Sequence, residues 1–482
     1  MRITALSLLL GAGSVAALEV DFDSTSSVKA AAKDVAFDLM SYYKGNQSGE
    51  IPGLLTEDVS KWWTNALVWS SMIDYWRYTG DDTYNKVTVE GLIFQSGPSL
   101  RQPFLPANYS ISIANDEQGL WGMAAMQAAE VDFPSPPQGE PSWIELAKAV
   151  FDTQAARFSA EKTCGGGLRW AISPTSDMWH VKNTASTAVF LSLGARLYRF
   201  TNNETYAEWA ERSWNWLTDI GLIDDELNAW DSAVDGNGHC LAILKLQSSH
   251  PAAILIQAAA YMTSQTPNTT TAYQTWKTRL NNLTSHTLAH FFPASTNLTL
   301  IERMCKRPPN DNDKSTITAP KSSFCLSDQH YYKSLTLHAL HNAAAVIPPL
   351  HEPDHPLARA LRATAEAAAR SCVAGDTGRG CALEWATEVP GTVFGGSVPA
   401  ELTALAAVLA ALGGGLPPVR GGDGQGDEGV EGGGGGGNGG GNGGGEGGEG
   451  GEEGGNGDGG SGGASVRVTM GLVLAGLAAA LL

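Results

Sequence analysis

The sequence predicts an all-α protein whose helical hairpins close into an (α/α)6 toroid. Three observations favour this fold class. Apolar helices rich in small residues alternate with aromatic amphipathic helices along most of the chain. Tryptophans of the second helices, Trp143, Trp209 and Trp276, recur at spacings of 66 and 67 residues. Stretches typical of β-strands are scarce.

Five hairpins and one further helix are expected in residues 18–412, which we interpret as a single catalytic domain. In each hairpin an apolar helix leads through a polar or Pro-rich turn into an amphipathic helix. The expected pairs are 67–78 with 83–94, 119–131 with 142–158, 184–200 with 205–220, 251–263 with 269–292 and 332–347 with 357–372, and the last helix is 401–412. Such repeats bury a core only by stacking on their neighbours, and an open superhelix is the alternative to a closed ring.

Both ends of the chain resemble targeting signals. Residues 1–17 have one basic residue, a short apolar run and small residues, as in a cleaved signal peptide. Residues 413–463 are rich in Gly and acids and are expected to be a disordered linker. Residues 464–482 combine a polar spacer with an apolar tail, as in a GPI-attachment signal, with Ser461 as the expected attachment site. The alternatives are an uncleaved N-terminal anchor and a tail anchor.

A secreted, cell-surface chain is expected to carry disulfides and glycans. The six cysteines suggest three disulfides, for which sequence allows fifteen pairings. Proximity favours Cys372–Cys381 and Cys305–Cys325, which leaves Cys164–Cys240. The N-glycosylation sequons begin at Asn46, Asn108, Asn203, Asn268, Asn282 and Asn297.

The charge of the chain excludes one class of partner. The formal net charge is −19 at pH 7. Proteins that bind nucleic acid need a basic surface, and this sequence has none, so no nucleic-acid partner is expected. Membrane association is expected only through a GPI lipid.

The strongest local signal is a polar cluster, residues 115–118, at the start of an apolar helix. Asp116 and Glu117 are adjacent acids there. One interpretation is helix capping, because Asn and Asp cap helices and Glu favours the first turn. The other is a catalytic pair. Retaining glycosidases hold two carboxyls about 5 Å apart, and consecutive Cα atoms are about 3.8 Å apart, so a helix entrance can present both.

The run that contains this pair, Asn115-Asp116-Glu117-Gln118-Gly119-Leu120-Trp121-Gly122-Met123, resembles glycoside hydrolase family 76, in its fungal GPI-anchored mannan endo-1,6-α-mannosidase branch. Further matching runs follow in the family order. They include Trp62-Trp63, Ile73-Asp74-Tyr75-Trp76, Thr163-Cys164-Gly165-Gly166-Gly167-Leu168-Arg169-Trp170, Lys182-Asn183, Tyr206-Ala207-Glu208-Trp209 and Lys245-Leu246-Gln247. The resemblance covers roughly residues 20–405.

The resemblance implies an (α/α)6 barrel and a retaining attack on α-1,6-mannose linkages, with Asp116 as nucleophile and Glu117 as acid/base. It implies cell-wall α-1,6-mannan or the mannose of a GPI glycan as substrate, wall glucan as a possible acceptor, and no cofactor. The residues expected to contact sugar are Trp63, Asn115, Gln118, Trp121, Arg169, Trp170, Lys182 and Asn183. Hydrolysis and transglycosylation both remain open.

The sequence departs from the family at two places. The second family Asp is Glu117 here, which is one methylene longer. The family usually reads Gln-Phe-Ser-Tyr-Asn-Ala-Gly near the fourth hairpin, where this chain has His250, Pro251 and Ala253 in place of Tyr, Asn and Gly. These departures keep two alternatives open: a noncatalytic mannan-binding wall protein on the same fold, and a toroid glycosidase for another polysaccharide.

No metal site is predicted. Residues 351–355 mimic a zinc-protease motif, but Pro353 interrupts the helix that the motif requires. His286 and His290 have helical spacing without an evident third ligand, and 235–239 lacks the terminal Glu of a calcium loop.

Overall fold

The computed structural model describes residues 18–55, 62–106, 112–236, 238–303, 327–373, 379–385 and 396–412. The chain divides into two compact units, of which the first, 1–307 with 323–423, contains all of these residues. The predicted signal peptide, Gly-rich linker and GPI signal lie outside the described residues. Among the described helices, none is both long enough and apolar enough to cross a membrane.

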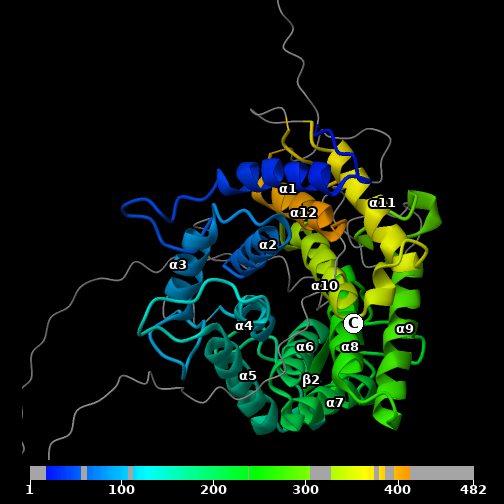
Figure 1. Ribbon diagram of the computed structural model, residues 1–482. Coiled ribbons are helices and arrows are strands. Elements are labelled where there is room, and N and C mark those ends of the chain that lie inside the picture. Colours follow the sequence, from blue (N-terminus) through cyan, green and yellow to red (C-terminus); the bar gives the residue numbers. More distant parts are fainter. Residues whose placement is uncertain are drawn as a thin grey trace, which may run out of the picture. The chain divides into compact units, whose positions relative to one another are not determined.

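Among the helices that the structure describes, six form a closed inner ring (Figure 1). Each one packs on the next, and the last packs on the first. Their side chains are buried on nearly every side, because each helix has a neighbour on both flanks and an outer layer behind it. In chain order they are α2 (Thr64–Thr79), α4 (Asn115–Glu130), α6 (Thr184–Thr201), α8 (Ser249–Gln265), α10 (Tyr332–Val346) and α12 (Val398–Ala410).

Six outer helices cover this ring. They bury one face only, as α7 does with Tyr206, Trp214 and Leu217. In chain order they are α1 (Thr25–Met40), α3 (Asn85–Ser96), α5 (Trp143–Ala160), α7 (Glu204–Asp219), α9 (Thr271–Phe291) and α11 (Pro356–Arg370). The predicted (α/α)6 toroid is confirmed, and the five predicted hairpins agree with the observed helices to within a few residues.

The sixth hairpin was not predicted as a pair, because its two helices come from opposite ends of the domain. α1 packs against α12 and α2, so blue α1 lies beside orange α12 in Figure 1. α1 begins at the N-cap Ser24, whose side chain accepts the backbone N–H of Ser27. Its buried face contains Val28, Ala32 and Leu39, a spacing that fits a helix.

A small sheet, which the sequence analysis did not predict, lies beside the start of α6. Its antiparallel strands are β1 (Val181–Asn183), β2 (Ser232–Gly236) and β3 (His239–Leu244), in that spatial order. β1 pairs with β2 in the register Lys182↔Ala233. The strands are too short for the alternation that identifies a strand in sequence. β1 runs directly into α6 and thereby fixes the entrance of that helix.

Two disulfides lie within the described residues: one is the pair that proximity favoured, and the other is the pair that was left over. Cys164 bonds to Cys240 and Cys372 bonds to Cys381. The third predicted pair, Cys305–Cys325, lies outside the described residues.

The loop after Cys164 needs glycine. Gly167 has φ +81°, and a Cβ there would meet the Trp216 ring at 2.1 Å. The loop therefore lies flat on Trp216, with the disulfide holding it to β3.

The positions of the sequons within the described residues are compatible with N-glycosylation. Five of the six predicted sites are exposed, and Asn108 lies outside the described residues. The exposed sites are Asn46, Asn203, Asn268, Asn282 and Asn297.

Candidate active site

The inner helices begin at one end of the ring, which we call the mouth. Contacts between their first residues establish this. Asp116 of α4 accepts a hydrogen bond from Asn183 at the entrance of α6, at 3.0 Å. His250 of α8 stacks on Tyr332 of α10 with ring centroids 4.1 Å apart. Trp63, just before α2, meets the Tyr331 ring at 5.8 Å.

Asp116 is partly buried at the mouth. Its Oδ2 accepts the hydrogen bond from Asn183, and its Oδ1 accepts the backbone N–H of Glu117 at 3.0 Å. Burial raises the pKa of Asp116 to about 6, and the nearby Asp231 carboxylate adds to the rise, while the two hydrogen bonds oppose it. Asp116 is therefore a carboxyl that changes charge in the mildly acidic range.

Asn183 positions Asp116 from a fixed site. Its side-chain oxygen accepts the backbone N–H of Ser186 at 3.1 Å and so caps α6. The amide nitrogen is thereby directed to Asp116. One side chain thus ties the entrances of α4 and α6 together and holds the carboxylate in place.

Glu117 is also partly buried and turns back on its own helix. Its Oε2 accepts the backbone N–H of Ala114 at 2.9 Å, which is one half of a capping box. Ala114 has no side-chain oxygen to supply the other half. The prediction that Glu117 caps the helix is therefore correct for this contact. Glu117 also lies at the mouth beside Asp116.

Further acids lie around the mouth and were missed by the sequence analysis. Burial raises the pKa of Tyr332, and the carboxylates of Asp328, Asp231, Glu302 and Asp116 add to the rise. Four acids from four segments therefore act electrostatically on one phenol. No local motif marks Asp231 in the sequence. It reaches the mouth because it comes directly before β2.

Three of the predicted sugar contacts are core residues instead. Asn115, Gln118 and Trp121 are buried, at 1%, 0% and 0% exposure. Trp121 is stacked between the rings of Trp62 and Phe104, at 5.2 and 5.5 Å. A ring covered on both faces has no surface left for a sugar, so that expectation is wrong for Trp121.

The amides of Asn115 and Gln118 are occupied inside the protein. Arg157 donates to both side-chain oxygens. The Asn115 amide nitrogen donates to the carbonyl of Arg169 at 2.9 Å, and that of Gln118 donates to the carbonyl of Pro103. These contacts fix the entrance of α4 rather than a ligand.

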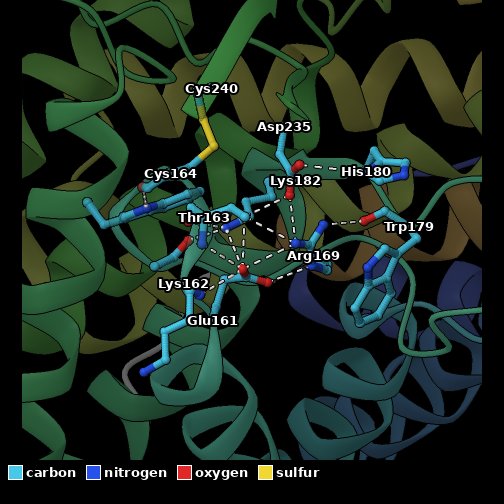
Figure 2. The surroundings of a disulfide bond; sticks show 12 residues. Glu161, Lys162, Thr163, Cys164, Arg169, Trp179, His180, Lys182, Asp235 and Cys240 are labelled. Carbon is cyan, nitrogen blue, oxygen red and sulfur yellow. Dashed lines mark hydrogen bonds and ion pairs between the residues drawn. A yellow bond between two sulfur atoms is a disulfide. The ribbon is translucent and has the colours of Figure 1, made fainter. Parts of the chain in front are cut away.

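Arg169 and Lys182 belong to a buried ion network beneath the Cys164–Cys240 disulfide (Figure 2). Arg169 pairs with Glu161 at 2.5 Å and with Asp235 at 2.6 Å. Lys182 is fully buried and donates to the carbonyls of Thr163 and Gly166, at 2.7 and 2.5 Å. The sequence analysis expected both cations to contact sugar, and the structure corrects this, because their donors are used within the network.

Trp170 remains available to a ligand, whereas Trp63 is buried in the core. Trp63 is 7% exposed at the start of α2. Trp170 is partly exposed, and its backbone connects two elements of the mouth: its N–H donates to Val181, and its carbonyl accepts from Asn115. Trp170 stays a candidate for contact with a sugar ring, whereas the expectation for Trp63 is not supported, because its ring is packed in the core.

Comparison with known proteins agrees with this architecture. The model of glycosyl hydrolase family 76 matches residues 27–419. The chain belongs to glycosyl hydrolase family 76. The mannan endo-1,6-α-mannosidase DCW1 of Candida glabrata is 34% identical over 386 residues, covering 80% of this chain and 79% of that protein. The protein of the same name from Saccharomyces cerevisiae is 32% identical, covering 77% and 76%.

Solved structures of the family share the fold. The crystal structure of Dfg5 from Chaetomium thermophilum, in complex with glucosamine, has a TM-score of 0.71 and 35% identity, covering 81% of this chain and 92% of that one. A Salegentibacter α-1,6-mannanase, in an inactive variant with two consecutive aspartates replaced and in complex with α-1,6-mannotriose, has a TM-score of 0.55 and 17% identity. The match covers 80% of this chain and 99% of that one. At this sequence identity it supports a shared fold and nothing further.

Proposed function

We propose that this family 76 member is an endo-acting α-1,6-mannosidase or mannan transglycosidase of the fungal cell wall. Its relatives that cover most of the chain carry the name mannan endo-1,6-α-mannosidase. The observation that carries the proposal is the Asp116–Glu117 pair, which lies at the mouth where the inner helices begin. Adjacent carboxyls at a helix entrance can serve one glycosidic bond.

In this mechanism Asp116 is the nucleophile. Its carboxylate attacks the anomeric carbon of a mannose and forms a covalent glycosyl-enzyme, while the bond to the leaving oxygen breaks. Asn183 holds the carboxylate in line through its amide. The positive end of the α4 dipole stabilises the anionic form before attack. The pKa of about 6 means that this form predominates only above that pH.

Glu117 supplies the proton in the same mechanism. It donates a proton to the leaving oxygen and then, as carboxylate, takes one from the water or sugar hydroxyl that releases the glycosyl-enzyme. Attack by Asp116 removes the neighbouring negative charge, which favours ionised Glu117 for this second step. Whether water or a sugar hydroxyl attacks decides between hydrolysis and transfer.

The other acids suit recognition of a neutral sugar. Carboxylates accept hydrogen bonds from pairs of hydroxyls, and a partly exposed phenol both donates and stacks. We infer that Asp231 and Tyr332 hold the hydroxyls of a mannose next to Asp116, because the Asp231 carboxylate raises the pKa of Asp116 and the carboxylates of Asp231 and Asp116 both raise the pKa of Tyr332. Trp170, which is partly exposed, then offers a ring face at the mouth.

The wider setting follows from the chain ends. We propose secretion through residues 1–17 and attachment to the outer face of the cell membrane by GPI at Ser461 or a neighbouring Gly. The substrates consistent with that place are wall α-1,6-mannan and the mannose of GPI glycans, with wall glucan as acceptor.

The proposal is tested by incubating the purified protein with a linear α-1,6-mannohexaose, with and without added acceptor oligosaccharides. We expect internal cleavage, with the α-anomer appearing first in the NMR spectrum, as retention requires. An initial β-anomer would contradict the nucleophilic role of Asp116. Binding of the hexaose without cleavage or transfer would instead favour the noncatalytic alternative, to which the capping contact of Glu117 lends support.

A further inference from the structure

The backbone of Trp170 joins the two helix entrances at which the Asp116 carboxyl and its amide partner lie. The carbonyl of Trp170 accepts the backbone N–H of Asn115, which directly precedes Asp116, at 2.8 Å. The N–H of Trp170 donates to the carbonyl of Val181, at the start of β1, at 2.7 Å. β1 ends at Asn183, whose amide donates to Asp116. A shift of Trp170 would therefore change the distance between Asn183 and Asp116.

Arg169, the residue before Trp170, is fixed by its side chain. Its Nε lies 2.5 Å from a carboxylate oxygen of Glu161, and one terminal nitrogen lies 2.6 Å from a carboxylate oxygen of Asp235. The other terminal nitrogen donates to the carbonyl of Trp179 at 2.7 Å, and the guanidinium lies 4.5 Å from the centre of the Trp179 ring. Figure 2 shows the guanidinium between the two acids. Arg169 thereby holds the backbone at Trp170 in one place.

Lys182 anchors β1 from the face opposite Asn183. Successive side chains of a strand point to opposite faces, so the side chain of Lys182 extends away from the one that meets Asp116. Lys182 is fully buried, and its Nζ donates to the carbonyls of Thr163 and Gly166. The same Nζ lies 3.7 Å from a carboxylate oxygen of Glu161. A strand of only three residues is in this way held to the loop beneath it.

Asp235 of β2 connects the two cations to the rest of the sheet. Its carboxylate accepts the hydroxyl of Thr163 at 2.7 Å in addition to the pair with Arg169. Its backbone N–H donates to the carbonyl of His180, directly before β1, at 2.8 Å. Two acids and two cations balance each other here. The Arg169 network is our name for these four residues, Glu161, Arg169, Lys182 and Asp235.

The Arg169 network contacts the Asp116 carboxyl only through the backbone and through Asn183. Among the described residues, the hydrogen bonds of the Asp116 side chain go to Asn183 and to the backbone of residues 116 and 117. A buried ion pair contributes little net stability, because the loss of hydration offsets the attraction. Its geometry is nevertheless specific, since each charged group needs its partners in fixed directions. The network is thus better suited to fixing positions than to adding stability.

We propose that the Arg169 network positions the Asp116 carboxyl for catalysis without touching the sugar. By fixing the backbone at Trp170 and the strand β1, it keeps the amide of Asn183 at hydrogen-bonding distance from Asp116. The inference rests on the proposed function, because the carboxyl that is positioned is the proposed nucleophile. Arg169 and Lys182 are then positioning residues, and their substitution acts on Asp116 through Asn183.

Two variants test the proposal by the titration of Asp116, followed by ¹³C NMR of protein labelled at the aspartate carboxyls, with Asp116→Asn to assign the signal. Arg169→Lys keeps the charge but loses the planar fork. Asp235→Asn removes a negative charge, whose direct effect would lower the pKa of Asp116. We expect the pKa of Asp116 to rise above about 6 in both, because the hydrogen bond from Asn183 lowers it in the wild type.

Turnover supplies a second measurement on the same two variants. We expect kcat on α-1,6-mannohexaose to fall by about 10–10²-fold, since a misplacement of about 1 Å costs up to about 10²-fold. KM should change little, because Arg169 and Asp235 do not contact the sugar. The acid limb of the kcat/KM profile should move to higher pH together with the NMR titration.

Arg196→Lys is the matched control, because Arg196 is a fully buried arginine of α6 that pairs with Glu130 at 2.6 Å, away from the mouth. It should leave the titration of Asp116 and kcat unchanged. An unchanged titration in Arg169→Lys, a lowered pKa in Asp235→Asn, or the same shift in Arg196→Lys would overturn the proposal. If a network variant fails to fold, Glu161→Gln replaces it. A wild type that cleaves no mannan would refute the proposed function, while the NMR titration still decides the positioning.

Discussion

Glu117 in α4 and Glu145 in α5 occupy the same position in two neighbouring helices. Each carboxylate turns back to accept the backbone N–H three residues earlier, from Ala114 at 2.9 Å and from Ser142 at 2.8 Å. By local sequence and geometry alone, both are capping residues.

The two glutamates differ in their surroundings. Ser142 completes its capping box with a hydroxyl, and hydrogen bonds from it hold the pKa of Glu145 below its usual value. α4 instead has Ala114 at its N-cap, which is a poor capping residue. Asp116, whose pKa is raised, lies next to Glu117. The preference for a capping side chain at the N-cap is therefore broken at the start of α4 and obeyed at the start of α5. Such a departure is expected where the start of a helix has a functional role, as proposed for α4.

The largest effect is expected from Asp116→Asn. The variant keeps the shape of the side chain but removes the proposed nucleophile, so cleavage of α-1,6-mannohexaose should fall by about 10³-fold or more. The circular dichroism spectrum should be unchanged. Activity close to that of the wild type would remove Asp116 from the mechanism, and a loss of folding would assign it to the entrance of α4 alone.

Glu117→Gln and Glu145→Gln test the comparison directly, because glutamine preserves the capping contact in both helices. We expect Glu117→Gln to slow a native mannan substrate by about 10²–10⁴-fold. A substrate with an activated leaving group should instead form the glycosyl-enzyme and stall, and azide should restore turnover.

Glu145→Gln is the matched control and should keep full activity on both substrates. Equal losses in the two variants, or uniform loss in Glu117→Gln without azide rescue, would mean that Glu117 is a cap and not an acid/base.

A smaller effect is expected from Asn183→Ser. Serine still caps α6 but no longer donates an amide to Asp116. We expect kcat to fall about tenfold. Because the lost hydrogen bond lowers the pKa of Asp116 in the wild type, the acid limb of the kcat/KM profile should move from near pH 6 to higher pH.

Asn203→Ser is the control for Asn183→Ser, since Asn203 caps α7 in the same way on the outer layer. It should be made in a host without N-glycosylation, because it also removes a sequon. A shifted pH profile in this variant too would indicate a general helix effect.

A further effect concerns stability rather than activity. The pKa of Asp116 rises from an ordinary 3.8 to about 6 on folding, so the ionised carboxylate opposes folding above that range. Asp116→Asn should therefore raise the free energy of unfolding at pH 7 by about 3 kcal/mol. The gain should shrink as pH falls from 6 to 4 and vanish below 4, where the wild-type carboxyl is protonated in both states. Urea titrations of the variant and the wild type at pH 7 and pH 4 measure the gain in the free energy of unfolding. An equal gain at both pH values would show that the raised pKa of Asp116 is not its cause.

The helices could be predicted from sequence because their apolar pattern is local, and the repeat of hairpins predicted the ring, but the hairpin of α1 and α12 that closes the ring could not be predicted. α1 has a helical spacing, yet its partner α12 lies at the other end of the domain, and no periodicity connects them. The sheet was missed because β1 has three residues.

The site residues also differ in whether a local sequence signal identifies them. Asp116 and Glu117 were found because they are adjacent, whereas Asp231 is brought to the mouth only by folding. Arg169 and Lys182 were misassigned to sugar, because the prediction rested only on their place in runs that match the family. Their partners Glu161 and Asp235 lie 74 positions apart in the sequence, so the network that buries them has no local signature.

The pairing of α1 with α12 also constrains how this protein is made. A solenoid can fold repeat by repeat as it is synthesised, since each unit needs only its predecessor. Here the first helix synthesised has to wait for the last, and α2 lacks one neighbour until α12 has emerged. The nascent chain therefore exposes an open ring edge throughout translation, a state in which apolar helices invite wrong partners. Assistance by chaperones should matter most for this protein just before synthesis of the domain is complete.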